Sequence, residues 1–339
     1  MIESVRFQNF KALQNTTLPL GPFTLIVGPN GSGKSTALQA LIGASRGGLS
    51  FASIVTANLA ISDSTRVMVV LQWSAPHTNV LTEGVWRRNG TFHREHKHFK
   101  TGATIHDNAG VGQFLTKQLA AIRVYSLEAR AIARAAELRP NEKLQEDGSR
   151  LAGVLDRLRD SIPERFETLN AELGRCLPEF DRILFATPAP GERSFSLRMR
   201  EGQHSIPAVE LSQGTLLALA ILTLAYLPDP PPMVCFEEPD RGIHPRLLRD
   251  VRDALYRLSY PQHFGESRDP VQVIATTHSP YFLDLFKDHP EEIVIAQKVG
   301  PEARFERLSD REDLAEILRD AHLGDVWYSG ILGGVPCQQ

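Results

Sequence analysis

The stretch Gly28-Pro-Asn-Gly-Ser-Gly-Lys34-Ser35-Thr36 decides the fold that we predict for this chain. It follows the apolar run Phe23-Thr-Leu-Ile-Val27, which has the pattern of a buried strand, and Ser35 to Ile42 continues as a helix. Glycines let main-chain N–H groups turn inward around an anion, and the following helix adds its N-terminal dipole. Strand, glycine-rich loop and helix in this order predict a phosphate-binding loop.

Each residue type in the loop suits a nucleotide. Lys34 would place its charge on the β- and γ-phosphates, and the Ser35 hydroxyl would ligate Mg²⁺. The alternative is a glycine-rich turn without a ligand, and the full motif directly after a strand argues against it. We therefore expect ATP and Mg²⁺ as cofactors. The expected contacts to the nucleotide also include Asn30, Gly31, Gly33 and Thr36.

A second apolar strand, Met233 to Phe236, ends in the carboxylates Glu237 and Glu238. An acidic pair after a strand is often no more than a solvated strand end. Beside a phosphate-binding loop, however, the first carboxylate would hold the Mg²⁺ shell and the second would activate water next to the γ-phosphate. We therefore assign Glu237 to the metal and Glu238 to catalysis.

Two further motifs complete the predicted site. Leu211-Ser212-Gln-Gly214-Thr215 begins an apolar helix, where Ser212 either caps the helix or, with Gly214, binds the γ-phosphate of a nucleotide held by another subunit. Thr276-Thr277-His278-Ser279-Pro280 ends another apolar strand. His278 there is either an ordinary packed or surface residue or a contact to the γ-phosphate or the attacking water, and we favour the second interpretation.

The composition and charge of the chain exclude several classes of protein. The net charge of −3 gives no overall electrostatic attraction to nucleic acid, and 42% hydrophobic residues support a substantial core. Cys176, Cys235 and Cys337 are far apart, which indicates reduced thiols rather than a disulfide framework. Early charges such as Glu3 and Arg6 do not fit a signal peptide, and no apolar run is long enough for a membrane span. We expect a cytoplasmic protein with no membrane association.

The pattern along the chain predicts an α/β fold: a mixed sheet core with an antiparallel β lobe and a helical insertion. Residues 105–180 have helical character, and the pattern from Phe114 to Leu138 predicts one helix. We predict one ATPase domain over 1–339, built from 1–104 and 181–339, with 105–180 inserted. In the β lobe, Asn89-Gly90 predicts a two-residue type I′ hairpin turn that sets Trp86 opposite His93.

The hairpin strand that follows this turn is basic. Arg87, Arg88, Arg94, Lys97 and Lys100 stand against Glu95, and three histidines lie among them, at 93, 96 and 98. One interpretation is a nucleic-acid patch on which Trp86 or Phe92 stacks a base. The other is a solvated hairpin face, and the sequence favours neither. A metal site is less favoured, because alternation separates His93 from His96 and His98.

Together the motifs GPNGSGKST, LSQGT, FEEPD and TTHS resemble, in this order, the ABC-type P-loop ATPase heads. Phe10-Lys11, the Gly242-Ile-His244-Pro245 stretch and the Leu323 to Gly330 segment look like the ATPases related to RecF and the OLD nucleases. The resemblance implies an ATP-dependent homodimer, with Ser212 and Gly214 acting in trans and the other site residues in cis. It also implies a glutamine ligand for Mg²⁺, for which Gln72 is the nearest candidate.

Two departures narrow this resemblance. The segment between Lys34 and Ser212 has no sustained heptads, so we expect no long coiled coil. The residues after His278 offer no acidic cluster for a two-metal nuclease site. We therefore expect an ATPase that controls a separately encoded effector, nuclease-like or toxin-like, in anti-phage defence. The alternatives are a RecF-like ATPase of DNA metabolism, a transporter motor and a non-hydrolysing scaffold.

Overall fold

The computed structural model of this 339-residue chain describes residues 1–57, 59–107, 110–202, 204–314 and 322–332. These residues form two compact units, which we treat separately. The first unit contains Met1–Val124, Pro231–Cys235 and the described part of Val271–Gln339. The second contains Tyr125–Pro230 and Phe236–Pro270. No helix in the described part of the chain is long and apolar enough to cross a membrane.

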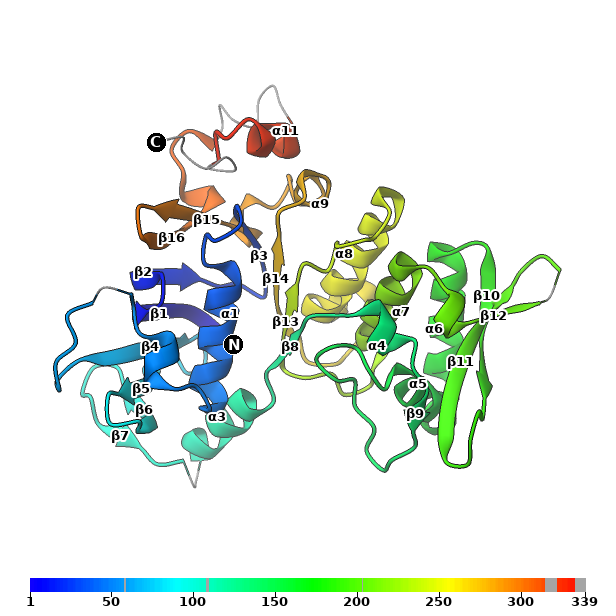
Figure 1. The fold of residues 1–339 in the computed structure, drawn as a ribbon, viewed down its shortest axis with the longest axis horizontal. Helices are drawn as coiled ribbons and strands as arrows, with labels where there is room; N and C mark the ends of the chain where they lie inside the picture. Colours follow the sequence, from blue (N-terminus) through cyan, green and yellow to red (C-terminus); the bar gives the residue numbers. More distant parts are fainter. Residues whose placement is uncertain (58, 108–109, 203, 315–321, 333–339) are drawn as a thin grey trace. The chain divides into compact units, whose positions relative to one another are not determined.

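An antiparallel sheet forms the β lobe of the first unit (Figure 1, blue to cyan). Along β4 the side chains of Val67, Val69, Leu71 and Trp73 alternate inward, which is the pattern of a sheet with one buried face. The strand order is β2-β1-β4-β5-β6-β7. The bounds are β1 Ile2–Phe10, β2 Leu13–Pro19, β4 Arg66–Trp73, β5 Val80–Arg87, β6 Phe92–His98 and β7 Thr104–Ile105.

A second, mixed sheet carries the phosphate loop. Strand β3 is buried on both faces, and it pairs in parallel with β14 and with β15. Burial on both faces explains why its sequence is continuously apolar rather than alternating. The order is β16-β15-β3-β14-β13-β8. The bounds are β3 Phe23–Val27, β8 Arg123–Tyr125, β13 Met233–Glu237, β14 Gln272–Thr277, β15 Ile293–Val299 and β16 Glu302–Arg307.

Helix α1 follows β3 and contributes to the main core of the first unit, where Ala37, Leu38 and Leu41 pack with residues of the β lobe. Figure 1 shows α1 beside β1 and β4. The helices among the described residues of the first unit are α1 Lys34–Arg46, α2 Phe51–Ile54, α3 Gly110–Ala120, α9 Pro280–Asp284 and α11 Leu323–Tyr328, with short 3₁₀ turns at Pro290–Glu292 and Leu308–Asp310.

The second unit is built around α7, whose residues from Gly214 to Tyr226 are all buried. A helix that is apolar on every side needs neighbours on every side, and α4, α6 and α8 pack against it. The helices are α4 Ala129–Ile132, α5 Leu151–Ser161, α6 Pro163–Cys176, α7 Gln213–Tyr226 and α8 Pro245–Ser259. A small sheet and two 3₁₀ turns complete the unit: β9 Ala136–Glu137, β10 Phe180–Ala186, β11 Glu192–Met199, β12 Ser205–Pro207, Ala208–Glu210 and Pro261–Phe264.

The predicted helix from Phe114 to Leu138 is wrong. Helix α3 ends at Ala120, and β8 and the short α4 follow it. The local Ala- and Leu-rich composition favours a helix, but Tyr125 at the end of β8 is buried and stacks on Phe236 at 5.4 Å. The two compact units also divide the chain at other positions than the predicted boundaries after residues 104 and 180. The grouping of 1–104 with 181–339 stays a prediction.

The hairpin between β5 and β6 has a different turn from the predicted one. Its loop spans residues 88–91, and only Gly90 of the predicted turn pair takes a positive φ, 81°. A type I′ turn requires positive φ at both central residues, so Asn89-Gly90 does not form one. The register therefore shifts: Trp86 pairs with Phe92, and His93 pairs with Val85.

Candidate functional site

The phosphate loop joins β3 to α1 in the first unit. Gly31 and Gly33 have φ values of 77° and 94°, in the left-handed region that favours glycine. Gly33 is the N-cap of α1 and offers no side chain to its first turn. The N–H groups of that turn are therefore not occupied by a capping side chain, which is the arrangement that binds anions.

Lys34 is buried at the start of α1 and curls back over the loop. Its Nζ donates to the carbonyl oxygens of Gly28 at 2.6 Å and Pro29 at 3.1 Å. These bonds hold the ammonium group beside the loop main chain, where a phosphate would add negative charge. Among the other predicted contacts, Asn30, Gly31 and Ser35 are exposed, Thr36 is half-buried and Gly33 is buried.

Small residues far away in the sequence hold the loop from beneath. A Cβ on Gly28 would come within 2.9 Å of the Cβ of Ala296 in β15, and one on Gly33 within 2.8 Å of the Cβ of Ala303 in β16. At both positions an alanine lies directly against the loop, so a larger side chain there would press on the glycines. Sequence reasoning missed these two residues, because no motif connects them to the loop.

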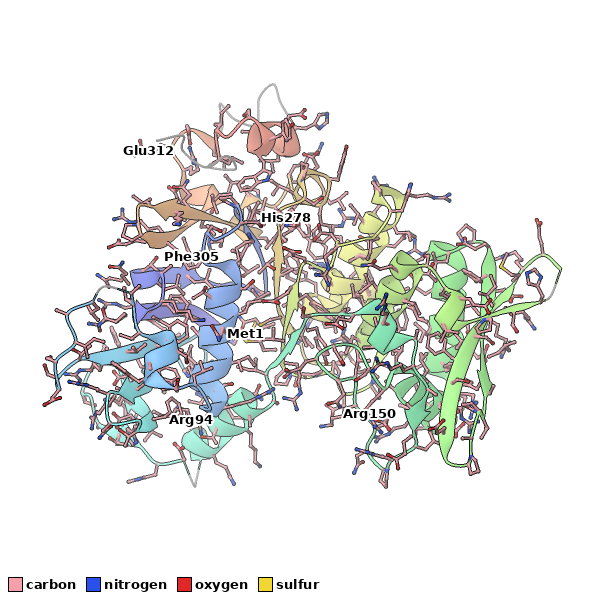
Figure 2. All side chains as sticks on the ribbon, in the orientation of Figure 1. Met1, Arg94, Arg150, His278, Phe305 and Glu312 are labelled. Atoms are coloured by element: carbon pink, nitrogen blue, oxygen red, sulfur yellow. The ribbon has the colours of Figure 1, made fainter. Side chains whose placement is uncertain are left out.

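His278 lies in the same unit, directly after β14. Thr277 pairs with Val27, so β14 and β3 end at the same level, and the phosphate loop and His278 leave the sheet at the same edge. Figure 2 shows His278 at the end of β14. The Oγ of Ser279 caps α9 by accepting from the N–H of Phe282 at 3.3 Å, which fixes the turn after an exposed His278.

Gln72 is not brought to the phosphate loop. It pairs with Ser4 near the end of β4, and the adjacent Ile2 exchanges main-chain hydrogen bonds with the side chain of Gln272, at the start of β14. The phosphate loop follows Val27, at the end of the mixed sheet opposite to Gln272. The length of β14, about 3.3 Å per residue, separates the two ends. This position does not support the metal role suggested for Gln72.

The acidic pair belongs to the second unit. Glu237 ends β13, and both Glu237 and Glu238 are half-buried. Glu238 has a φ of 48°, a left-handed conformation that costs a residue with a Cβ about 1–2 kcal/mol. The carbonyl of Glu238 accepts from the N–H of Arg241 at 3.0 Å, which closes a tight turn after the strand. Such strain collects at functional sites, where the surrounding structure must hold it.

Ser212 is the N-cap of α7 in the same unit. Its Oγ accepts from the N–H of Thr215 at 3.1 Å and lies 2.8 Å from the Thr215 hydroxyl. The simpler interpretation, a helix cap, is therefore confirmed. Ser212 is nevertheless exposed at a helix N-terminus, which leaves the predicted phosphate contact open, whereas Gly214 is buried.

The basic hairpin is mostly neutralised within the first unit. Lys97 lies 2.6 Å from Glu83 and 2.5 Å from Glu95, and its hydrogen bond to Glu83 raises the pKa of Lys97. Arg88 pairs with Asp63, while Arg87 and Lys100 are exposed without an ion pair among the described residues. The charge available for a nucleic acid is therefore much smaller than the sequence suggests.

The aromatic residues of this hairpin face the core. Trp86 is 1% exposed and packs at 4.8 Å on Phe92, which argues against the interpretation in which Trp86 stacks on a base. Both rings are used to support α1: a Cβ on Gly43 would lie 3.2 Å from Trp86, and one on Gly47 would lie 2.9 Å from Phe92. The hairpin is thus a structural support for the helix that begins at the phosphate loop.

His96 is part of a buried hydrogen-bond chain. Its Nδ1 lies 2.7 Å from the hydroxyl of Thr82, which accepts from the indole N–H of Trp73 at 2.8 Å, and its Nε2 lies 3.1 Å from the hydroxyl of Thr116. Burial lowers the pKa of His96. The part of the chain that the structure describes holds no cluster of His, Cys, Asp and Glu suited to a metal ion. Cys176 and Cys235 are buried, and Cys337 lies outside the described residues.

Comparison with solved structures defines the class of the fold. The chain is similar to an Smc head bound to the C-terminal winged-helix domain of ScpA, with a TM-score of 0.66, 15% identity, and coverage of 93% of this chain and 99% of that one. It is also similar to an Smc head with an extended coiled coil from Pyrococcus furiosus, bound to the C-terminal domain of ScpA, with a TM-score of 0.63, 15% identity, and coverage of 94% and 99%. The predicted fold, an α/β P-loop ATPase head of the ABC type, is therefore confirmed.

Family models then place the chain more narrowly. Residues 100–284 match the model described as "AAA domain, putative AbiEii toxin, Type IV TA system", and residues 1–57 match an AAA ATPase domain. The chain belongs to the first of these families, and it is an ATPase, as the phosphate loop predicts. It is also 25% identical over 324 residues to an OLD nuclease of Thermus scotoductus. That alignment covers 84% of this chain but only 60% of the relative.

Proposed function

We propose that this ATPase closes into a homodimer around ATP and Mg²⁺ and thereby controls a separate effector protein in anti-phage defence. The observation that supports this most is the exposed Ser212 at the N-terminus of α7, a position where a helix can receive a phosphate. The first unit presents Lys34 and His278, whereas the exposed Ser212 starts a helix of the second unit. A second copy of the chain would supply Ser212 to the γ-phosphate bound at Lys34.

The residues have distinct roles in this proposal. Lys34 neutralises the β- and γ-phosphates, and the exposed Ser35 hydroxyl and the Glu237 carboxylate are the hard oxygen donors that Mg²⁺ prefers. Glu238 accepts a proton from the attacking water, and His278 contacts the γ-phosphate. Ser212 and Gly214 act from the other subunit. Dimer closure then changes the affinity of the ATPase for the effector, which is bound in one state of the dimer and released in the other.

The effector role is supported by the relation to the OLD nuclease. This chain spans about 60% of that relative, and no metal cluster for a nuclease occurs among its described residues. In this proposal the nuclease activity named in that relative indicates the kind of chemistry that the controlled effector performs. The location of the complex in the cytoplasm remains part of the same proposal.

The alternative, an ATPase of DNA metabolism, depends on direct DNA binding. The hairpin that suggested this contact has most of its cations paired and both of its aromatic rings packed on α1. We therefore prefer the effector-controlling ATPase, and the alternative becomes an outcome of the test.

The test compares the wild type with Lys34→Ala and Glu238→Gln, with Glu210→Gln as a control for an exposed carboxylate outside the site. Light scattering measures the mass with and without ATP and Mg²⁺. Glu238→Gln should accumulate as a dimer with ATP, because it binds ATP but cannot complete hydrolysis, and Lys34→Ala should remain monomeric. If Glu238→Gln forms no more dimer than the wild type, the dimer is excluded.

The effector is tested by purification with the product of the neighbouring gene. An ATP-dependent complex that Lys34→Ala abolishes would support the proposed role. Absence of a partner, together with strong stimulation of turnover by DNA, would replace it with the DNA-metabolism function.

A further inference from the structure

The first turn of α7 packs directly on the loop that follows Glu238. A Cβ on Gly214 would lie 3.0 Å from the carbonyl oxygen of Gly242 and 3.4 Å from the Cα of Ile243. No side chain fits there without displacing main chain. Gly214 is therefore required for contact within the second unit, independently of any phosphate.

Gln213, next to it, covers the same loop from the outside. A Cβ on Gly242 would lie 2.7 Å from the Nε2 and 2.8 Å from the Cδ of Gln213. Gly242 has a φ of 74°, a backbone conformation that favours glycine. The end of the Gln213 side chain thus lies close to Gly242.

The loop under Gln213 is short and closely tied. Two turns follow one another, with hydrogen bonds from the N–H of Arg241 to the carbonyl of Glu238 at 3.0 Å and from that of Ile243 to Asp240 at 3.2 Å. Ile243 is buried, which anchors the far end of the loop. A change in the backbone conformation of Glu238 should therefore also move Gly242.

We propose that Gln213 is a positioning residue that couples Ser212 to Glu238 within one chain. Its side chain transmits the position of the Glu238–Ile243 loop to the first turn of α7, where Ser212 lies. This inference rests on the proposed homodimer, in which Glu238 acts on the nucleotide of its own chain and Ser212 on that of the partner. The contact would then make the two ATP sites cooperative.

The experiment compares Gln213→Ala with Gln213→Met, which keeps the length and packing of the side chain, and with the control Glu210→Gln. Steady-state hydrolysis gives kcat, KM and the Hill coefficient for ATP, and thermal unfolding gives Tm. Gln213→Ala should lower kcat about tenfold, since small misplacement of catalytic groups is costly. It should leave the KM for ATP within about twofold of the wild-type value, because Lys34 is unchanged. The Hill coefficient should fall from above 1 to about 1, Tm should be unchanged, and Gln213→Met should restore kcat and the Hill coefficient.

The outcomes separate this inference from the proposed function. If Glu238→Gln still forms the ATP-dependent dimer but Gln213→Ala keeps wild-type kcat and Hill coefficient, the coupling role is overturned and the dimer stands. A wild-type Hill coefficient of 1 would also overturn it. A loss of kcat that accompanies a lower Tm would assign Gln213 a merely structural role. Failure of Glu238→Gln to dimerise would remove the proposed function itself.

Discussion

The two ends of helix α1 meet very different surroundings. Its N-terminal end is the glycine loop, where Lys34 lies on two main-chain carbonyls. Its C-terminal end lies on the β5–β6 hairpin, where Arg94 donates to the carbonyl of Ser45 at 2.5 Å. Both regions contain basic residues, but only the first holds its lysine on a glycine loop at the start of a helix.

The two regions differ in the groups that surround each cation, and this difference determines whether the cation can serve in binding or in structure. The Lys34 ammonium donates to two main-chain carbonyls of the glycine loop, whereas Lys97 in the hairpin faces two carboxylates. Arg94 caps the negative end of the α1 dipole, a structural use of positive charge. The hairpin therefore supports the helix, and the loop is the part of this region that is built to bind an anion.

The sharpest test of this comparison removes one lysine from each region. Lys34→Ala should lower ATP turnover about 100-fold or more, because it removes the cation that stabilises the transferred phosphate. Lys97→Ala should leave turnover within about twofold. Both are measured as Mg²⁺-dependent phosphate release, with Tm as a check on folding. Equal losses in the two variants would contradict the comparison.

A second prediction concerns the strand beneath the loop. Ala303→Leu should weaken ATP binding about tenfold, since an overpacked contact costs about 1–3 kcal/mol and Gly33 must move. Arg304→Leu is the matched control, because this neighbouring side chain is 63% exposed. Calorimetric titration with ATP measures both. Undiminished affinity in Ala303→Leu would show that the loop does not depend on this support.

At the other end of α1, Arg94→Ala should lower the free energy of unfolding by about 1–3 kcal/mol, because it removes a partly buried charged hydrogen bond at the helix terminus. Arg88→Ala should change it by less than about 1 kcal/mol, since its partner Asp63 is almost fully exposed. Urea unfolding gives both values. A similar cost in the two variants would argue against a supporting role for Arg94.

The smallest expected effect is the pH dependence contributed by His96. Burial lowers its pKa, with Asp107 opposing and Arg94 assisting, so the unfolded chain binds this proton more readily than the folded one. The stability due to neutral His96 is present above the ordinary histidine pKa and is lost as the pH falls towards the lowered one. His96→Gln should reduce the fall of Tm between pH 7 and pH 5, and the exposed His98→Gln should not. If the Tm of His96→Gln falls between pH 7 and pH 5 as much as that of the wild type, this would be evidence against a neutral buried histidine.

How far the sequence could predict this protein depends on the range of the interactions involved. The phosphate loop was predictable because Gly31, Gly33 and Lys34 act through backbone conformation within a few residues. The hairpin was predicted as an element, but its turn and register were not. Asn89-Gly90 is a local signal, whereas packing of Trp86 and Phe92 on α1 is a tertiary one.

The sequence alone determined that a strand, a glycine loop and a helix form a phosphate-binding ATPase, since contiguous residues fix that geometry. Tertiary structure decided the rest. It put Gln72 in the antiparallel sheet, away from the phosphate loop, placed Ala296 and Ala303 under the loop, and paired most cations of the basic hairpin with carboxylates. These outcomes depend on contacts between residues far apart in the chain. No local pattern encodes such contacts, because packing and ion pairing are settled only when the elements meet.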